Sequence, residues 1–136
     1  MITGIGHAAF IVNDMEKSLE FYCGVLGFTK AFELFRDDGS NYIVYVKICD
    51  GQFLELFYPK EEFPPQNMWK SEGYGHLCLT TDDIYKTYDE VKARGAKIEL
   101  EIQKGKDKNL QFWMQDPDGN GVEIMQIMPE SRQVRG

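Results

Sequence analysis

One pattern occurs twice in the chain, and this internal repeat constrains the fold more than any other feature. The segment GIGHAAFIVNDMEKSLEFY (residues 4–22) returns as GYGHLCLTTDDIYKTYDEV (residues 73–91). In both segments a Gly-His pair precedes an apolar run, a polar pair and a helix-like pattern, and His76 follows His7 by 69 residues. A repeat of this kind indicates that the chain is built from two similar supersecondary units.

One helix is predicted in each repeat. Apolar residues recur with the i, i+4, i+7 spacing of a single helical face at positions 15, 19 and 22, and again at positions 84, 88 and 91. The N-caps are expected at Asn13 or Asp14 in the first helix and at Asp82 or Asp83 in the second. The glycines at positions 27 and 95 are expected to end the two helices.

Strands are predicted on both sides of each helix. The first repeat predicts strands over residues 4–12, 28–35, 41–49 and 52–58, and the second over residues 74–81, 97–102, 109–115 and 121–127. Turn-forming segments such as DPDGN separate them. Each half therefore reads β-α-β-β-β. We expect a first module over residues 1–58, a connector over 59–73, a second module over 74–128 and a polar tail over 129–136.

Composition narrows the class of protein. The chain has 136 residues, 43% of them hydrophobic, which suits one compact domain or two half-domains. With 15 basic and 22 acidic residues its formal net charge is −7, which argues against nonspecific nucleic-acid binding. No apolar run approaches the length of a membrane span, and no basic segment precedes the short N-terminal apolar run. We therefore expect a cytoplasmic protein that partners neither nucleic acid nor membrane.

The three cysteines give a weaker indication, which concerns disulfide formation and zinc binding. Cys23, Cys49 and Cys78 are far apart in the sequence and odd in number. They fit reduced, mostly buried thiols better than a disulfide framework or a zinc ribbon.

Four ionisable residues stand in predicted strands among mostly apolar or small neighbours. Because alternate strand residues share a face, His7, Glu55, His76 and Glu123 are each flanked on their own face by such neighbours. A glutamate inside FLELF or GVEIM is costly if it is buried and unpaired. The repeat relates the four in pairs, since His7 and Glu55 are 48 residues apart and His76 and Glu123 are 47 apart.

Two such halves that face each other across a pseudo-two-fold axis would bring two imidazoles and two carboxylates to one point. This donor set contains no thiolate and neutralises a divalent first-row metal, so it predicts a six-coordinate site with open water positions. Ni²⁺, Co²⁺, Zn²⁺, Mn²⁺ and Fe²⁺ all fit these ligands. A single strand histidine is usually a structural residue and a single glutamate usually lies on an edge, but the pairwise repetition favours a metal site.

These residues lie in motifs that resemble the vicinal oxygen chelate superfamily, namely GHAAFIVNDMEKSLEFYCGVLGF, FLELF, GHLCLTTDD and DPDGNGVEIMQ. That superfamily includes glyoxalase I, extradiol dioxygenases, methylmalonyl-CoA epimerase and the fosfomycin and bleomycin resistance proteins. The resemblance covers residues 2–128. It implies an α+β fold in which paired βαβββ modules form a cup-shaped mixed sheet around a metal.

The ligand set resembles the glyoxalase I (lactoylglutathione lyase) type within that superfamily. Its members use His, Glu, His, Glu, which matches His7, Glu55, His76 and Glu123. The resemblance implies a lyase that isomerises the hemithioacetal of methylglyoxal and a thiol through an enediolate, with one divalent metal per site. Glu123 would be the base, and Glu55 could serve on the other face.

The resemblance also implies partners. Many relatives build each cup from two chains, so we expect a homodimer with shared active sites, although a cup within one chain fits the sequence equally well. Glutathione or another low-molecular-weight thiol would be the co-substrate. Glutathione-dependent members commonly carry Arg and Asn where this chain has Ile11 and Pro59, which puts glutathione itself in doubt.

Five further residues are candidates for substrate contact. Lys104 and Lys106 lie in the loop QKGKDKN and could hold an anionic tail, although a solvated turn is the ordinary interpretation. Phe53, Phe57 and Met125 could line an apolar pocket or simply fill the cup.

Three other functions stay open. The same chemistry would suit an epimerase or isomerase acting on another vicinal-oxygen substrate, and a redox-active metal would suit a dioxygenase. A non-catalytic binding or resistance protein is disfavoured, because binding alone does not need an open metal.

Overall fold

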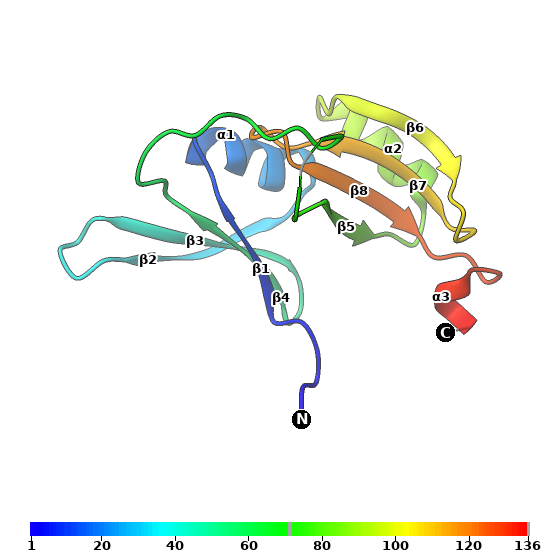
Figure 1. The fold of residues 1–136 in the computed structure, drawn as a ribbon, viewed down its shortest axis with the longest axis horizontal. Coiled ribbons are helices and arrows are strands. Elements are labelled where there is room, and N and C mark those ends of the chain that lie inside the picture. Colours follow the sequence, from blue (N-terminus) through cyan, green and yellow to red (C-terminus); the bar gives the residue numbers. More distant parts are fainter. Residues whose placement is uncertain (71, 136) are drawn as a thin grey trace. The chain divides into compact units, whose positions relative to one another are not determined.

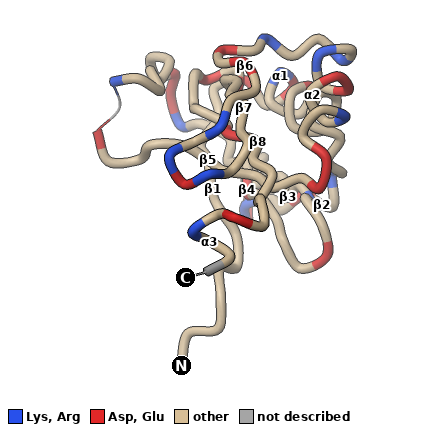
Figure 2. The backbone as a smooth tube through the Cα atoms, turned by 90° about the vertical axis from the view of Figure 1, so that its right-hand side faces the viewer, with Lys and Arg blue, Asp and Glu red and all other residues tan. Residues whose placement is uncertain are grey.

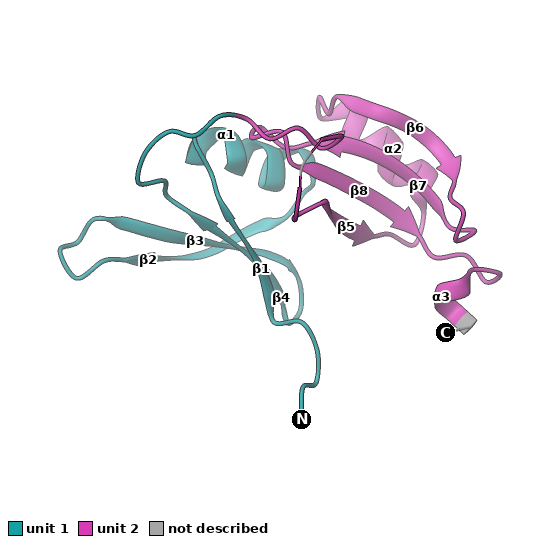
Figure 3. Ribbon diagram, in the orientation of Figure 1, with its two compact units in different colours: residues 1–64 teal, residues 65–136 magenta. Residues whose placement is uncertain are grey.

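The computed structural model describes every residue except 71 and 136 and divides the chain into two compact units, residues 1–64 and 65–136 (Figures 1 and 3). The first unit contains β1 (His7–Ile11), α1 (Met15–Leu19), the π-helical turn η1 (Glu20–Val25), β2 (Thr29–Phe35), β3 (Asn41–Cys49) and β4 (Gln52–Phe57). The second contains β5 (His76–Thr80), α2 (Ile84–Ala93), β6 (Ile98–Lys104), β7 (Leu110–Gln115), β8 (Gly121–Gln126) and α3 (Arg132–Arg135).

Each unit has one four-stranded mixed sheet with the same topology. The strand orders are β1-β4-β3-β2 and β5-β8-β7-β6. The first strand of each unit pairs in parallel with the last, and the other pairs are antiparallel. A parallel pair needs a long crossover, and here the chain between the two strands supplies the helix and the other two strands. The predicted α+β fold of βαβββ modules is confirmed.

The helices begin and end where the sequence predicts, and the structure decides between the alternatives for each cap. The side chains of Asp14 and Asp83 accept hydrogen bonds from the backbone N–H groups of Lys17 and Lys86. These carboxylates satisfy donors that the first helical turn leaves unpaired. Positive φ angles of 78° at residue 27 and 92° at residue 95 fit the predicted glycine ends.

One face of each sheet packs against its own helix and forms the core. In the first unit the ring of Phe10 lies 6.3 Å from that of Tyr22, and Val44, Val46 and Leu54 on the same face are fully buried. In the second unit Tyr88 of α2 contacts Phe112 of β7 edge to face at 5.2 Å. Because strand side chains alternate, the residues between these core positions lie on the opposite face of each sheet.

Two local expectations need correction. The strand expected from residue 4 begins at His7, after two glycines that offer no side chain for packing. The polar tail expected over 129–136 stays a prediction; it contains helix α3, and Ser131 before this helix is buried. The cysteines are free, but the expectation of mostly buried thiols is wrong, because Cys49 and Cys78 are exposed and only Cys23 is half-buried.

Charged residues do not segregate by sign. Figure 2 shows acidic and basic residues interspersed along the backbone of both units. None of the helices in the described part of the chain is both long and apolar enough to cross a membrane.

The turn that leads into β8 depends on one glycine. Gly119 has φ +82°, and a Cβ atom there would lie 2.2 Å from the backbone oxygen of Gln66. Gly39 also has φ +82°, but a Cβ there would meet nothing within 4 Å.

Gly39→Ala should therefore lower the free energy of unfolding only by the cost of the left-handed backbone, about 1–2 kcal/mol. We expect Gly119→Ala to lower it by at least about 2 kcal/mol more, because of the clash with Gln66. Chemical denaturation of both variants measures the difference, and equal losses would contradict the clash.

Candidate metal centre

The parallel pairing of β1 with β4 brings the first histidine to the first glutamate. Ala9 is the register partner of Glu55, so His7, two residues earlier, shares the face of Glu55. The imidazole Nε2 of His7 lies 3.3 Å from Oε2 of Glu55. The glutamate side chain is 9% exposed, whereas that of the histidine is 49% exposed. The pair therefore presents its imidazole to the surface and keeps its carboxylate within the sheet.

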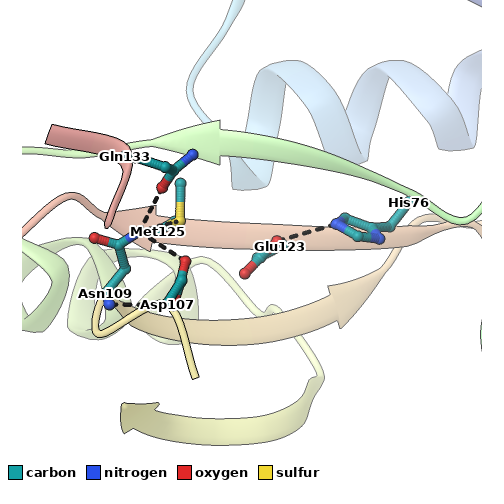
Figure 4. A network of polar contacts seen from close by, with 6 residues as sticks. All are labelled: His76, Asp107, Asn109, Glu123, Met125 and Gln133. Atoms are coloured by element: carbon teal, nitrogen blue, oxygen red, sulfur yellow. Dashed lines mark hydrogen bonds and ion pairs between the residues drawn. The ribbon is translucent and has the colours of Figure 1, made fainter. Parts of the chain in front are cut away.

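The second unit repeats this geometry on β5 and β8. Cys78 is the register partner of Glu123, and His76 again lies two residues earlier on the same face. Here Nε2 lies 3.0 Å from Oε2, and the two side chains point toward each other (Figure 4). The exposed fractions, 40% for the histidine and 9% for the glutamate, are close to those of the first pair.

The spacing within each pair fits two ligands of one ion. Two donor atoms that each lie about 2.1 Å from a metal and subtend a right angle are about 3.0 Å apart. A hydrogen bond from Nε2–H can bridge the same distance when no metal is present. Among the described residues no group of three or more His, Cys, Asp or Glu side chains is arranged to hold a metal ion, so each unit offers a pair.

A tyrosine holds the other oxygen of the first carboxylate. Tyr45, the antiparallel register partner of Glu55 on β3, donates its phenolic O–H to Oε1. This hydrogen bond, followed by partial burial and the nearby carboxylate charge, raises the pKa of Tyr45. Glu55 thus has a partner for each of its two oxygens.

A glutamine serves the second carboxylate in the same way. In the amide orientation that satisfies its neighbours, Gln111 of β7 donates to Oε1 of Glu123 at 2.6 Å. Its amide oxygen then accepts from the indole N–H of Trp113 at 3.3 Å. The ring of Trp113 meets that of His76 with centroids 4.6 Å apart.

Sequence reasoning missed these three residues, although a signal for two of them exists. Tyr45 stands ten residues before Glu55, and Trp113 stands ten residues before Glu123. Both are the register partners of their glutamates, so the repeat marks an aromatic residue beside each carboxylate. Gln111 has no counterpart in the repeat, because the first unit carries Ile43 at that register position.

The apolar candidates for substrate contact share the faces of the two glutamates. Phe53 and Phe57 flank Glu55 on β4 and are half-buried. Met125 flanks Glu123 on β8, is buried, and accepts a hydrogen bond on its sulfur from Asn109 at 3.3 Å (Figure 4). Asn109 also donates to Gln133 of α3. Asn109 therefore links the C-terminal helix to Met125, which lies on the same sheet face as Glu123.

The two lysine candidates lie in different surroundings. Lys104 at the end of β6 forms an ion pair with Glu130 at 2.8 Å. Lys106 is exposed in the turn that follows, which the Gly105 N–H closes by donating to the Asn109 carbonyl. The turn thus has the character of the solvated loop that the sequence also allows.

Comparisons with known proteins identify the family to which the chain is similar. The family model described as "Glyoxalase/Bleomycin resistance protein/Dioxygenase superfamily" matches residues 4–124. A protein named "Probable lactoylglutathione lyase" from Vibrio cholerae serotype O1 is 31% identical over 128 residues, 88% of each chain. The uncharacterized protein YaeR of Escherichia coli is 30% identical over 124 residues, 88% of this chain and 93% of its own.

A solved structure agrees as well. A member of the same superfamily from Sphaerobacter thermophilus is 28% identical and superposes with a TM-score of 0.72. The match covers 93% of this chain and 98% of that one.

Cys78 provides a chemical reporter for Glu123. Partial burial, the charge of Glu123 and a hydrogen bond with it raise the pKa of the Cys78 thiol to about 12. At pH 8 only about one Cys78 thiol in 10⁴ is then ionised, so iodoacetamide should label Cys78 more slowly than Cys49, although both side chains are exposed. Glu123→Gln should lower that pKa and speed labelling of Cys78, and the matched Glu55→Gln should not. Peptide mapping by mass spectrometry measures the rates, and equal rates in both variants would refute the contact.

Proposed function

The chain belongs to the glyoxalase/bleomycin resistance protein/dioxygenase superfamily, and from this premise we propose that it is a metal-dependent lyase of the glyoxalase I type. Its substrate would be the hemithioacetal of an α-ketoaldehyde and a thiol, and its product a 2-hydroxyacyl thioester. The observation that carries this proposal is the recurrence of one histidine–glutamate pair in each βαβββ unit, at equivalent strand positions. The name of the Vibrio cholerae relative supports it.

His7, Glu55, His76 and Glu123 would hold one divalent ion between them. The spacing of each pair suits adjacent ligands, and two neutral imidazoles with two carboxylates balance the ion's charge. When bound, such an ion would polarise the vicinal oxygens of the substrate and stabilise negative charge on them. Ni²⁺, Co²⁺, Zn²⁺, Mn²⁺ and Fe²⁺ are all compatible with these nitrogen and oxygen donors.

The carboxylates supply the proton transfers. We assign Glu123 as the base that removes the proton from the thiol-bearing carbon and returns it to the neighbouring carbonyl carbon, while the hydroxyl proton of the hemithioacetal moves to the neighbouring ketone oxygen. The thiol-bearing carbon thereby becomes the thioester carbonyl, and its neighbour becomes the hydroxyl-bearing carbon. Glu55 has an equivalent histidine contact in the other unit, with a phenol from Tyr45 as the second donor, and could serve on the opposite face of the substrate.

The thiol partner need not be glutathione. Ile11 lies on the same sheet face as Glu55 and is 60% exposed, where glutathione-dependent members commonly place an arginine. Lys104, a candidate for an anionic tail, is already paired with Glu130. We therefore propose glutathione or another low-molecular-weight thiol as co-substrate, with an apolar neighbour at Ile11 in place of a cation.

Turnover tests the activity directly. Protein stripped of metal and reloaded with Ni²⁺, Co²⁺ or Zn²⁺ should form thioester from methylglyoxal and glutathione, followed by ultraviolet absorbance. Glu123→Gln keeps the shape of the side chain but removes the base, so kcat should fall at least about 10²-fold. The control is Glu62→Gln, an exposed glutamate of the connector, which should leave kcat unchanged.

A lack of turnover would contradict the proposed reaction and direct attention to two others. Absence of turnover with every metal and with several thiols, in protein that holds about one metal per chain, would contradict lyase activity. Oxygen consumption with Fe²⁺ would then identify a dioxygenase, and proton exchange at an acyl thioester an epimerase.

We further propose a homodimer with shared active sites, in which His7 of one subunit works with His76 of the partner subunit. Mixing inactive His7→Ala and His76→Ala proteins tests this by subunit complementation. With free exchange, half of the dimers are mixed and each holds one intact site, so about a quarter of the original activity should return. If every site lies within one chain, the mixture stays inactive.

A further inference from the structure

Each glutamate proposed as a metal ligand also accepts a hydrogen bond from a second side chain, here called its second tether. The metal chemistry does not account for this contact. In each unit Oε2 of the glutamate faces the histidine, while Oε1 accepts a hydrogen bond from a side chain on the adjacent antiparallel strand. The donors differ chemically: a phenol from Tyr45 in the first unit and an amide from Gln111 in the second. The same oxygen is thus held in both units although the residue types have diverged.

In the second unit these contacts close a ring of four side chains. His76 contacts Glu123 at 3.0 Å, Glu123 accepts from Gln111 at 2.6 Å, and Gln111 accepts from Trp113 at 3.3 Å. The indole of Trp113 in turn contacts the imidazole of His76, with ring centroids 4.6 Å apart and planes 62° apart. A substitution at any of the four residues therefore alters the surroundings of both proposed ligands, His76 and Glu123.

In the first unit packing fixes the donor itself. The ring of Tyr45 stacks on Phe32 with centroids 4.3 Å apart and planes 19° apart, and it meets Phe53 edge to face at 6.3 Å. A ring held on two sides cannot swing its hydroxyl away from Glu55 without breaking those contacts.

We propose that Tyr45 and Gln111 are positioning residues that fix the orientation of the two glutamates, and that Trp113 locks Gln111 in place. The inference rests on the proposed function, because the orientation matters for a carboxylate that must bind an ion through one oxygen. A carboxylate without the second tether rotates about its side-chain torsions, and ordering it on binding costs affinity. Neither residue needs to touch substrate for this role.

Metal affinity tests the proposal without relying on catalysis. Tyr45→Phe and Gln111→Met remove the donors but keep side-chain size. By analogy with other residues that orient metal ligands, each should weaken Zn²⁺ binding about 10-fold or more in competition with a chromophoric chelator. Tyr42→Phe removes a phenol from the same strand, and Gln103→Met removes an amide from the strand paired with Gln111. Both controls should stay within about two-fold of the unmodified chain.

A spectroscopic readout separates positioning from a loss of fold. The chain has two tryptophans, Trp69 and Trp113, so Trp69→Phe leaves the ring beside His76 as the single reporter. Zn²⁺ should change the emission of Trp113 in this background, and adding Gln111→Met should shift the midpoint to higher metal concentration. Circular dichroism checks that each variant is folded, and the Tyr45 and Gln111 variants test the two units independently.

The outcomes are distinguishable. Folded Tyr45→Phe and Gln111→Met proteins that bind Zn²⁺ as tightly as the unmodified chain would overturn the positioning role and leave the proposed function intact. An unmodified chain that binds no Zn²⁺, Ni²⁺ or Co²⁺ would overturn both. Weakened binding in these two variants alone, with the controls unchanged, supports the proposal.

Discussion

The parallel pairing of the first and last strand of each unit is the constraint on which the rest of the site depends. Both histidines lie on the outer strands β1 and β5, and both glutamates lie on the neighbouring strands β4 and β8. The register sets each histidine two residues before the partner of its glutamate, which leaves Nε2 and Oε2 about 3 Å apart in both units. A shift of one residue would turn the histidine or the glutamate to the helix-covered face and separate the pair.

Because the two glutamates are buried, each carboxylate needs partners for its oxygens. A carboxylate taken out of water and left without partners costs several kcal/mol, and both glutamates are more than nine-tenths buried. Each is satisfied on both oxygens, by a histidine and by a donor from the antiparallel neighbour. We propose that these contacts keep the carboxylates ordered before any ligand arrives, as a preformed half-site requires.

The sequence predicted the topology well because the repeat and strand alternation are local signals. The strand faces of His7, Glu55, His76 and Glu123 follow from parity alone, and the observed register agrees with it. The choice of Asp14 and Asp83 as caps needed the structure, since two adjacent polar residues were equally suitable in each helix.

What the sequence could not give depends on contacts between distant segments. Gln111 carries no motif, and its contact with Glu123 follows only from the β7–β8 register. The pairing of Lys104 with Glu130 depends on how the chain after β8 folds back, which strand patterns do not encode. The exposure of Cys78 follows from its place on the outer strand β5, whereas hydropathy treats cysteine as a core residue.

We propose that the two histidine–glutamate pairs serve one metal ion. X-ray absorption spectroscopy of the nickel-loaded protein tests it most directly, because multiple scattering from imidazole rings counts the histidines on each ion. We expect two imidazoles per nickel, with only nitrogen and oxygen in the coordination shell. One imidazole per nickel, or a sulfur neighbour from Cys78, would contradict it.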